Sequence, residues 1–363
     1  MRYTLRLSRR DLLRIAGLST VGAGLGGLPQ HAIGQHTVRL IMGLTPHARL
    51  PTPASKHPAN PVLTPGPDAW DARNVLHCSI VRDDDGLKLY YTGETTPGYE
   101  FRSIGVALSG DGIHWKKHPG NPLIAPSRNI TSDEFDNVHC HTPTVLYRRQ
   151  ATPRYQMWYS GYQNNSGNRI GYASSDDGLH WVRRREPVLD YGKPDEFDDR
   201  GLRSPNVIIH PDTGEYWMYY NGTRPGQHYG PTGLAVSADG LRWEKRGKLS
   251  HDESRLLYGE VVYDPQAKLF RMWHDRGPTI TYAVSRDGIR WQDLDCPPLI
   301  QPGEPYDRGY CQAPSVLYDS SSRSYWVYYN GASSGEADKE HVTINLAVFP
   351  ESELATLRFH PPR

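Results

Sequence analysis

Acidic residues inside an otherwise apolar repeat are the first candidates for chemistry in this sequence. Glu260 stands in the stretch YGEVVYD, where the corresponding stretches read TPTVLY and APSVLY. A glutamate buried among apolar residues has a raised pKa, and such a carboxylic acid can donate a proton near neutral pH. We therefore predict that Glu260 is a general acid. The alternative is a solvated glutamate at the edge of a strand.

Aspartates that directly follow an aromatic residue recur just before four apolar strands; they are Asp71, Asp136, Asp198 and Asp307. Because one enzyme needs only two or three carboxylates, we expect most of these aspartates to cap turns by accepting backbone N–H groups. At most two are expected to be catalytic. We nominate Asp71 and Asp136 as the base or nucleophile that would work with Glu260.

Polar side chains also interrupt the apolar strands themselves. Four of them stand two residues before Ser or Pro, namely His77, His141, Arg203 and Gln312. Burying an unsatisfied polar group costs about 1–3 kcal/mol, so we predict that these side chains face a ligand. The alternative is a plug of mutually hydrogen-bonded groups around a water-filled axis. Nearby residues that carry charge or depart from the repeat complete the predicted binding set: Arg73, Arg200, His274 and Asp275.

The stretch His139-Cys140-His141 places two histidines on one face of a strand. Together with His77 they could bind a metal ion. No carboxylate or cysteine completes a known ligand spacing, so we interpret the histidines as hydrogen-bonding groups first and predict neither a metal nor another cofactor.

The strands that must position these residues are predicted from a repeated sequence motif. The phrase AVSADGLRW (235–243) has close copies at 107–115, 173–181 and 283–291, and an Asp-Gly turn between β-forming residues is a strong hairpin signal. A second phrase with alternating aromatics, such as YWMYYNG (216–222), occurs five times. Each unit therefore contains four strands, and five such units predict an all-β, five-bladed β-propeller of four-stranded antiparallel sheets. The Trp of each turn is expected to pack between neighbouring sheets.

The fifth unit ends at INLAVF (344–349) without its own Asp-Gly-Trp strand. A strand from the N-terminal side, either TVRLIM (37–42) or one near NPVL (60–63), would supply the missing strand and close the ring. We place the propeller at residues 55–350, an N-terminal segment at 33–54 and a C-terminal tail at 351–363.

The order of these motifs resembles the five-bladed β-propeller glycosidase superfamily, which includes invertase, levansucrase and arabinanase and glycoside hydrolase families 32, 43, 62, 68, 117 and 130. The resembling stretches include MWYSG (157–161), GYASSDDGLHW (171–181) and NPVL (60–63). The resemblance implies hydrolysis of a glycosidic bond by two carboxyl groups in an axial funnel, with a furanoside as the first expected substrate. It also implies a general-acid Glu on an inner strand of a middle blade, which fits Glu260. Asp71 departs from the Asp-Pro context of these families.

Two other functional classes use the same residues. A polysaccharide lyase would need a His or Tyr base and an arginine that neutralises a uronate, roles open to His77, His141, Tyr310 and Arg203. A non-catalytic sugar-binding propeller would need only the polar lining. In either case an aromatic rim is expected on which sugar rings pack; its predicted members are Trp70, Phe135, Phe197 and Tyr306.

Composition and the N-terminal residues indicate the expected binding partner and cellular location. The chain of 363 residues has a net charge of +1 and no basic stripe, so an oligo- or polysaccharide is a more plausible partner than nucleic acid. Residues 1–32 contain Arg9-Arg10 followed by a short, Gly-rich apolar segment, which resembles a twin-arginine export signal. We expect a periplasmic or secreted protein with no membrane span after signal removal, whose four cysteines are thiols that pack as small apolar groups.

Overall fold

The structure is a computed structural model that describes residues 55–66, 70–95, 101–164, 166–223, 230–249, 257–293, 297–335 and 341–355. All of them belong to one compact unit, residues 49–363. The predicted export signal (1–32) and the predicted closing strand at 37–42 lie outside the described residues.

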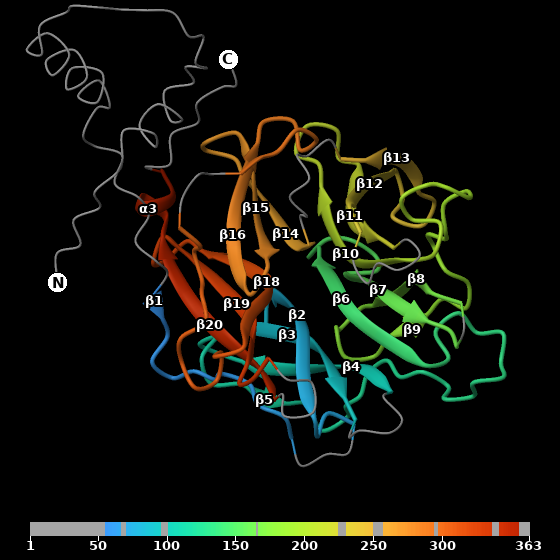
Figure 1. The fold of residues 1–363 in the computed structure, drawn as a ribbon, viewed down its shortest axis with the longest axis horizontal. Coiled ribbons are helices and arrows are strands. Elements are labelled where there is room, and N and C mark those ends of the chain that lie inside the picture. The colour runs from blue at the N-terminus through green and yellow to red at the C-terminus, as the bar shows by residue number, and fades with distance from the viewer. Residues whose placement is uncertain are drawn as a thin grey trace, which may run out of the picture. The chain divides into compact units, whose positions relative to one another are not determined.

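Five four-stranded antiparallel sheets form the five blades (Figure 1). Blade 1 contains β2 (Asn74–Arg82), β3 (Leu87–Glu94), β4 (Arg102–Ser109) and β5 (Lys116–Lys117). Blade 2 contains β6 (His139–Tyr147), β7 (Tyr155–Tyr162), β8 (Asn168–Ser175) and β9 (Val182–Arg183). Blade 3 contains β10 (Leu202–Ile209), β11 (Tyr216–Gly222), β12 (Thr232–Ser237) and β13 (Glu244–Lys248). One parallel bridge joins blades 1 and 2 between Arg102 and His139.

Blade 4 contains β14 (Leu257–Asp264), β15 (Leu269–Arg276), β16 (Thr279–Ser285) and β17 (Gln292–Asp293). Blade 5 contains β18 (Tyr310–Asp319), β19 (Ser324–Ala332), β20 (Val342–Pro350) and β1 (Ser55–Lys56). Its outer strand comes from the N-terminal side, just before the predicted NPVL stretch, where Leu63 also bridges Ile344. The short helix α3 (Glu351–Ala355) follows β20.

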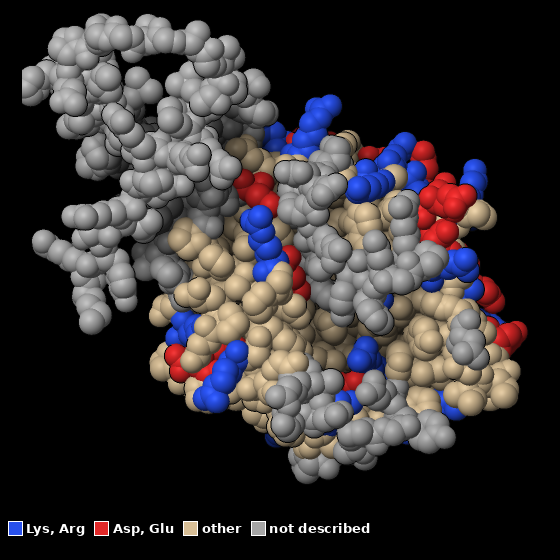
Figure 2. Space-filling view, viewed as in Figure 1, with Lys and Arg blue, Asp and Glu red and all other residues tan. Residues whose placement is uncertain are grey.

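The blades close into a ring. The first strand of each blade contacts the first strand of the next, from β2 through β6, β10, β14 and β18 and back to β2. Figure 1 shows the blades following one another in chain order around this axis. The predicted five-bladed propeller is therefore confirmed. On the face drawn in Figure 2, the described Lys and Arg side chains are interspersed with Asp and Glu rather than gathered in one basic area.

The repeated Asp-Gly turn joins adjacent blades. In each copy the aspartate accepts two backbone N–H groups further along the turn, as Asp111 does from Ile113 and His114. The glycine carbonyl then accepts a hydrogen bond from an aromatic side chain of the preceding blade: Tyr328 to Gly112, Tyr90 to Gly178, Trp158 to Gly240 and Tyr219 to Gly288. The Trp of each turn lies edge-on to the same aromatic ring, as Trp115 does to Tyr328. The expectation that these Trp side chains pack between sheets is confirmed.

The aromatic-Asp pairs belong to the blade interiors. Each aspartate is almost completely buried and accepts a hydrogen bond from a tyrosine of the blade's second strand, while a cation of the outer strand approaches the same carboxylate. We call this arrangement the blade stitch; its members are Asp71–Tyr91–Lys117, Asp136–Tyr159–Arg183, Asp198–Tyr220–Lys245 and Asp307–Tyr329–Lys56. The same stitch in four blades identifies a scaffold role, so the nomination of Asp71 and Asp136 as catalytic is corrected.

The predicted aromatic rim is also corrected. Trp70, Phe135 and Phe197 are buried in hydrophobic clusters. Each ring lies against two glycines, and a Cβ on Gly93 or Gly105 would come within 2.3–2.4 Å of the Trp70 ring. Tyr306 is half-buried, and its hydroxyl accepts the Asn60 amide. Trp70, Phe135 and Phe197 therefore fill their blades, and glycine is required opposite their rings because no side chain fits.

Candidate active site

A β-bulge in each inner strand shapes the centre of the ring. The residue at the bulge has left-handed backbone angles in four blades: His77 (φ 41°), Thr142 (φ 47°), Ser204 (φ 56°) and Ala313 (φ 51°). The strand register shows that His77 corresponds to these residues, whereas Leu76 corresponds to His141, Arg203 and Gln312. The predicted alignment of His77 with His141, Arg203 and Gln312 was therefore wrong by one residue, because Cys78 stands where blades 2, 3 and 5 have proline.

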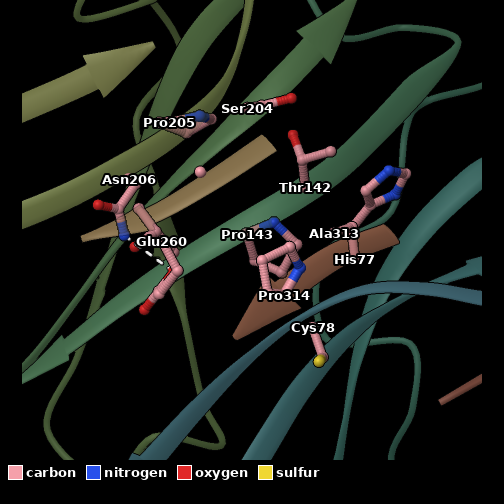
Figure 3. A pocket seen from close by; sticks show the side chains of 12 residues that line it. His77, Cys78, Thr142, Pro143, Ser204, Pro205, Asn206, Glu260, Ala313 and Pro314 are labelled. Carbon is pink, nitrogen blue, oxygen red and sulfur yellow. Dashed lines mark hydrogen bonds between the residues drawn. The ribbon is translucent and has the colours of Figure 1, made fainter. Parts of the chain in front are cut away.

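The bulges surround a pocket on the axis (Figure 3). Every blade contributes to its lining: His77, Cys78, Thr142, Pro143, Thr144, Ser204, Pro205, Asn206, Gly259, Glu260, Ala313 and Pro314. Of the predicted site residues, Glu260 and His77 line it. Glu260 is the only carboxyl group among these lining residues.

Glu260 is held by hydrogen bonds from two other blades. The Asn206 amide nitrogen of β10 donates to its Oε2 at 2.9 Å, and the Val316 backbone N–H of β18 donates to its carboxyl group. Burial raises the pKa of Glu260 to about 8, while these two donors oppose the shift. At neutral pH the axial pocket therefore contains a protonated carboxylic acid with a proton available for transfer.

A cluster of histidines and arginines lies on blades 1 to 3. Burial, together with the guanidinium charges of Arg102 and Arg203, lowers the pKa of His77 to about 3. Burial and Arg102 likewise lower the pKa of His139 to about 3 and hold the pKa of His141 well below its usual value. The three imidazoles are consequently neutral at neutral pH, and the positive charge of this cluster is carried by the arginines.

The pKa of Glu94 is shifted in the opposite direction to that of Glu260. It is buried, pairs with Arg102 at 3.0 Å and accepts the Asn74 amide at 2.7 Å. Although burial opposes it, the charge of Arg102 and these donors lower the pKa of Glu94, so it is ionised. Glu94, Arg102 and Asn74 were not predicted from the sequence, although Glu94 directly follows the recurrent Tyr-x-Gly phrase.

Blade 4 differs from the other blades at His274 and Asp275, two residues that were predicted to bind substrate. His274 is fully buried where four blades have tyrosine, and its Nε2 contacts Asp293 and Thr281. Asp275 is buried, and its Oδ1 accepts the Ala313 N–H at 2.8 Å. Neither residue lines the axial pocket, so the prediction that they bind substrate is corrected: both hold blade 4 to its own strands or to blade 5.

The remaining predicted residues are spread around the ring. Gln312 donates to the Gly277 carbonyl at 2.9 Å. Arg73 is half-buried, and its charge contributes to lowering the pKa of Glu94, whereas Arg200 is exposed. Cys78, Cys140 and Cys311 are buried free thiols, and Cys296 lies outside the described residues. Within the described ranges no three His, Cys, Asp or Glu residues form a metal-binding group.

The most informative sequence relative is the Uncharacterized protein Rv1502 of Mycobacterium tuberculosis. It is 30% identical over 238 residues, which cover 61% of this chain and 73% of the relative. A glycosyl hydrolase from Bacteroides ovatus has the same fold, with a TM-score of 0.63 and 17% identity over 85% of this chain and 96% of that one. The chain belongs to the family of the mycobacterial protein and shares the fold of the glycosyl hydrolase.

Other relatives and structural neighbours have different functions. A 1,2-β-oligomannan phosphorylase of Thermoanaerobacter is 30% identical over 139 residues, 37% of this chain and 43% of the relative. An N-acetyl-α-D-galactosamine deacetylase of Flavonifractor plautii is 23% identical over 65% of this chain and 35% of its own length. A structure of the GH130 family, described as mannoside phosphorylases and β-1,2-mannosidic hydrolases, has a TM-score of 0.61 and 18% identity over 85% of this chain and 96% of that one. The chain matches no protein-family profile.

Proposed function

We propose that this protein is a carbohydrate-active enzyme that hydrolyses a glycosidic bond, with Glu260 as the general acid. The observation that carries the proposal is a carboxyl group in the axial pocket whose pKa is about 8. Such a group is protonated at neutral pH and can protonate the oxygen of a departing sugar. The glycosidic relatives support the reaction class.

We propose Glu94 as the base in place of Asp71 and Asp136, although it pairs with Arg102 and is not among the residues that line the axial pocket. Its lowered pKa keeps it ionised while Glu260 stays protonated, and two carboxyl groups whose pKa values are shifted in opposite directions are a typical acid and base pair. In hydrolysis the base takes a proton from water as the water oxygen bonds to the anomeric carbon. The bond to the leaving oxygen breaks, and that oxygen takes the proton of Glu260.

Phosphorolysis is the second candidate function, and the arginine cluster favours it. Arg102 and Arg203 both act on His77, so two guanidinium groups lie near the pocket lining. Phosphate brings its own negative charge as the attacking group and needs no carboxylate base. The similarity to the oligomannan phosphorylase supports the same interpretation. The lyase alternative has less support, because an imidazole with a pKa of about 3 is a weak base.

The deciding experiment compares the wild type with Glu260→Gln on β-1,2-linked manno-oligosaccharides, arabinofuranosides and fructosides, with and without inorganic phosphate. We expect the substitution to lower kcat by about 10²–10⁴-fold. Glu304→Gln, at an exposed glutamate, is the matched control and should leave kcat unchanged.

The products identify the reaction. A free reducing sugar formed without phosphate supports hydrolysis, whereas a sugar 1-phosphate formed only with phosphate replaces it with phosphorolysis. An unsaturated product indicates a lyase, and binding without turnover indicates a non-catalytic propeller. Full activity in Glu260→Gln would remove Glu260 from the mechanism.

We also propose that the protein is exported by the twin-arginine route and acts on glycans outside the cytoplasm. Arg9-Arg10 and the apolar segment that follows support this. Within the described residues no helix is long and apolar enough to cross a membrane. Replacing both arginines with lysine should leave the chain in the cytoplasm of a host with this pathway, as cell fractionation would show. Unchanged export would contradict the proposal.

A further inference from the structure

Each inner strand carries one polar side chain that fastens it to the inner strand of the next blade, and we call these five side chains the seam residues. Each accepts the backbone N–H of a residue on the following blade. The pairs are Ser79 with Val145, Thr144 with Val207, Asn206 with Val261, Glu260 with Val316 and Ser315 with Ile80. Glu260 is thus a member of a structural ring as well as the candidate acid.

Asn206 differs from the other neutral seam residues because its acceptor oxygen and its donor nitrogen are separate atoms, whereas a Ser or Thr hydroxyl donates and accepts through one oxygen. Its Oδ1 accepts the Val261 N–H at 3.0 Å, which directs its amide nitrogen to the other side. That nitrogen donates to Glu260 Oε2 at 2.9 Å. The dashed line in Figure 3 marks this hydrogen bond. Ser79, Thr144 and Ser315 each present a single hydroxyl oxygen at the equivalent position and have no amide group. The difference lies directly beside the candidate acid.

Two neighbouring blades consequently donate hydrogen bonds to the Glu260 carboxyl group. Asn206 is 5% exposed and reaches it from β10, and the Val316 N–H reaches it from β18. Since Val261 follows Glu260 on β14, the Asn206 side chain bonds both to the acid and to the backbone beside it. The rotation of the carboxyl group is therefore set by the packing of three blades.

We propose that Asn206 is the positioning residue for Glu260: its amide orients the acid in the axial pocket and stabilises the carboxylate that remains after proton transfer. This inference rests on the proposed function for its catalytic meaning. When the Glu260 O–H proton moves to the leaving oxygen and the C–O bond breaks, the new negative charge stays on Glu260. The Asn206 and Val316 N–H groups then donate to a charged acceptor, and such hydrogen bonds are stronger than neutral ones.

Asn206→Thr tests the proposal because it copies the seam residue of blade 2. A threonine hydroxyl can still accept the Val261 N–H, as Thr144 does for Val207 at 3.5 Å, but the amide nitrogen that reaches Glu260 Oε2 is lost. We expect kcat/KM to fall by about 10–100-fold and the alkaline limb of its pH profile to move to higher pH, because a donor that favours the carboxylate has been removed. Ser315→Thr, which changes a seam residue without an amide, is the matched control and should preserve the profile.

A direct titration separates this inference from the proposed function. The pKa of the Glu260 carboxyl can be followed by infrared or NMR difference spectra of the full chain, with Glu260→Gln identifying its signal. A higher pKa in Asn206→Thr than in wild type supports the positioning role even if no tested sugar is cleaved. An unchanged pKa in a folded Asn206→Thr protein would overturn it, whatever the activity.

Discussion

Blade 4 and the other four blades solve the same structural problem with different groups. In blades 1, 2, 3 and 5 the blade stitch joins a buried aspartate, a tyrosine and an outer-strand cation. In blade 4 the tyrosine is replaced by His274 and the cation by Asp293, which bond to each other at 3.0 Å. Thr281 fills the position where blade 1 has Gly105, so blade 4 has no room for the aromatic ring that this glycine accommodates.

The difference extends to the seam between blades 4 and 5. Glu260 and Asp275 both accept N–H groups of β18, where other blades use hydroxyl or amide side chains such as Ser79 and Thr92. Burial raises the pKa of both acids. The repeated aspartates therefore lie in the blade stitches, whereas Glu260, which is not repeated, lies in the axial pocket.

The largest expected effect tests whether the repeated aspartates are structural. Asp71→Leu and Asp307→Leu should each lower the free energy of unfolding by about 3 kcal/mol, because each leaves a buried tyrosine hydroxyl and a lysine without their partner. Urea unfolding measures both. Similar losses in the two blades support a common stitch, and a stable Asp71→Leu protein that has lost only its activity would return Asp71 to the catalytic site.

A smaller loss of stability is expected when a residue of blade 4 is replaced by its counterpart in the other blades. His274→Tyr should destabilise the protein by about 2 kcal/mol, because a larger ring must fit beside Thr281 in a fully buried position. Adding Thr281→Gly should recover part of that loss, since the two positions are direct strand partners. Thermal unfolding of the single and double variants gives the coupling. Simple additivity of the two changes would show that Thr281 is not what excludes the tyrosine.

Acid should destabilise the protein through the histidines of blades 1 and 2. The pKa of His139 is about 3 in the folded state and about 6.5 when unfolded, so the folded chain binds fewer protons between these values. Stability is therefore lost as the pH falls from 6.5 toward 3, by about 1 kcal/mol per pH unit for this group. His139→Gln should show a shallower decline of Tm with acid. An identical decline would mean that His139 is protonated in the folded protein.

The smallest effect concerns the turns that four blades share. Asp111→Ala and Asp287→Ala each remove two hydrogen bonds to backbone N–H groups of an exposed turn. Each should lower stability by about 0.5–1 kcal/mol, the usual effect of losing a side-chain cap. Chemical denaturation of both variants should give equal losses, because the turn geometry of blades 1 and 4 is the same. A larger loss in blade 4 would show that its departures reach the turn.

The sequence by itself determined the architecture, because its signals are local. An Asp-Gly turn, a following Trp and an alternating strand act over a few residues, and their copies predicted the number and order of blades. Glu260 was also visible in the sequence, since it interrupts one copy of the repeat.

Only the tertiary structure decided what the polar residues do, because their partners come from other strands or other blades. Asp71 became a scaffold residue through Tyr91 and Lys117, which are 20 and 46 residues away. The role of Asn206 depends on Glu260, 54 residues further along. One bulge residue was enough to shift His77 out of its predicted alignment. Composition and spacing cannot specify such contacts, since they arise only when the ring closes and brings distant side chains to a common axis.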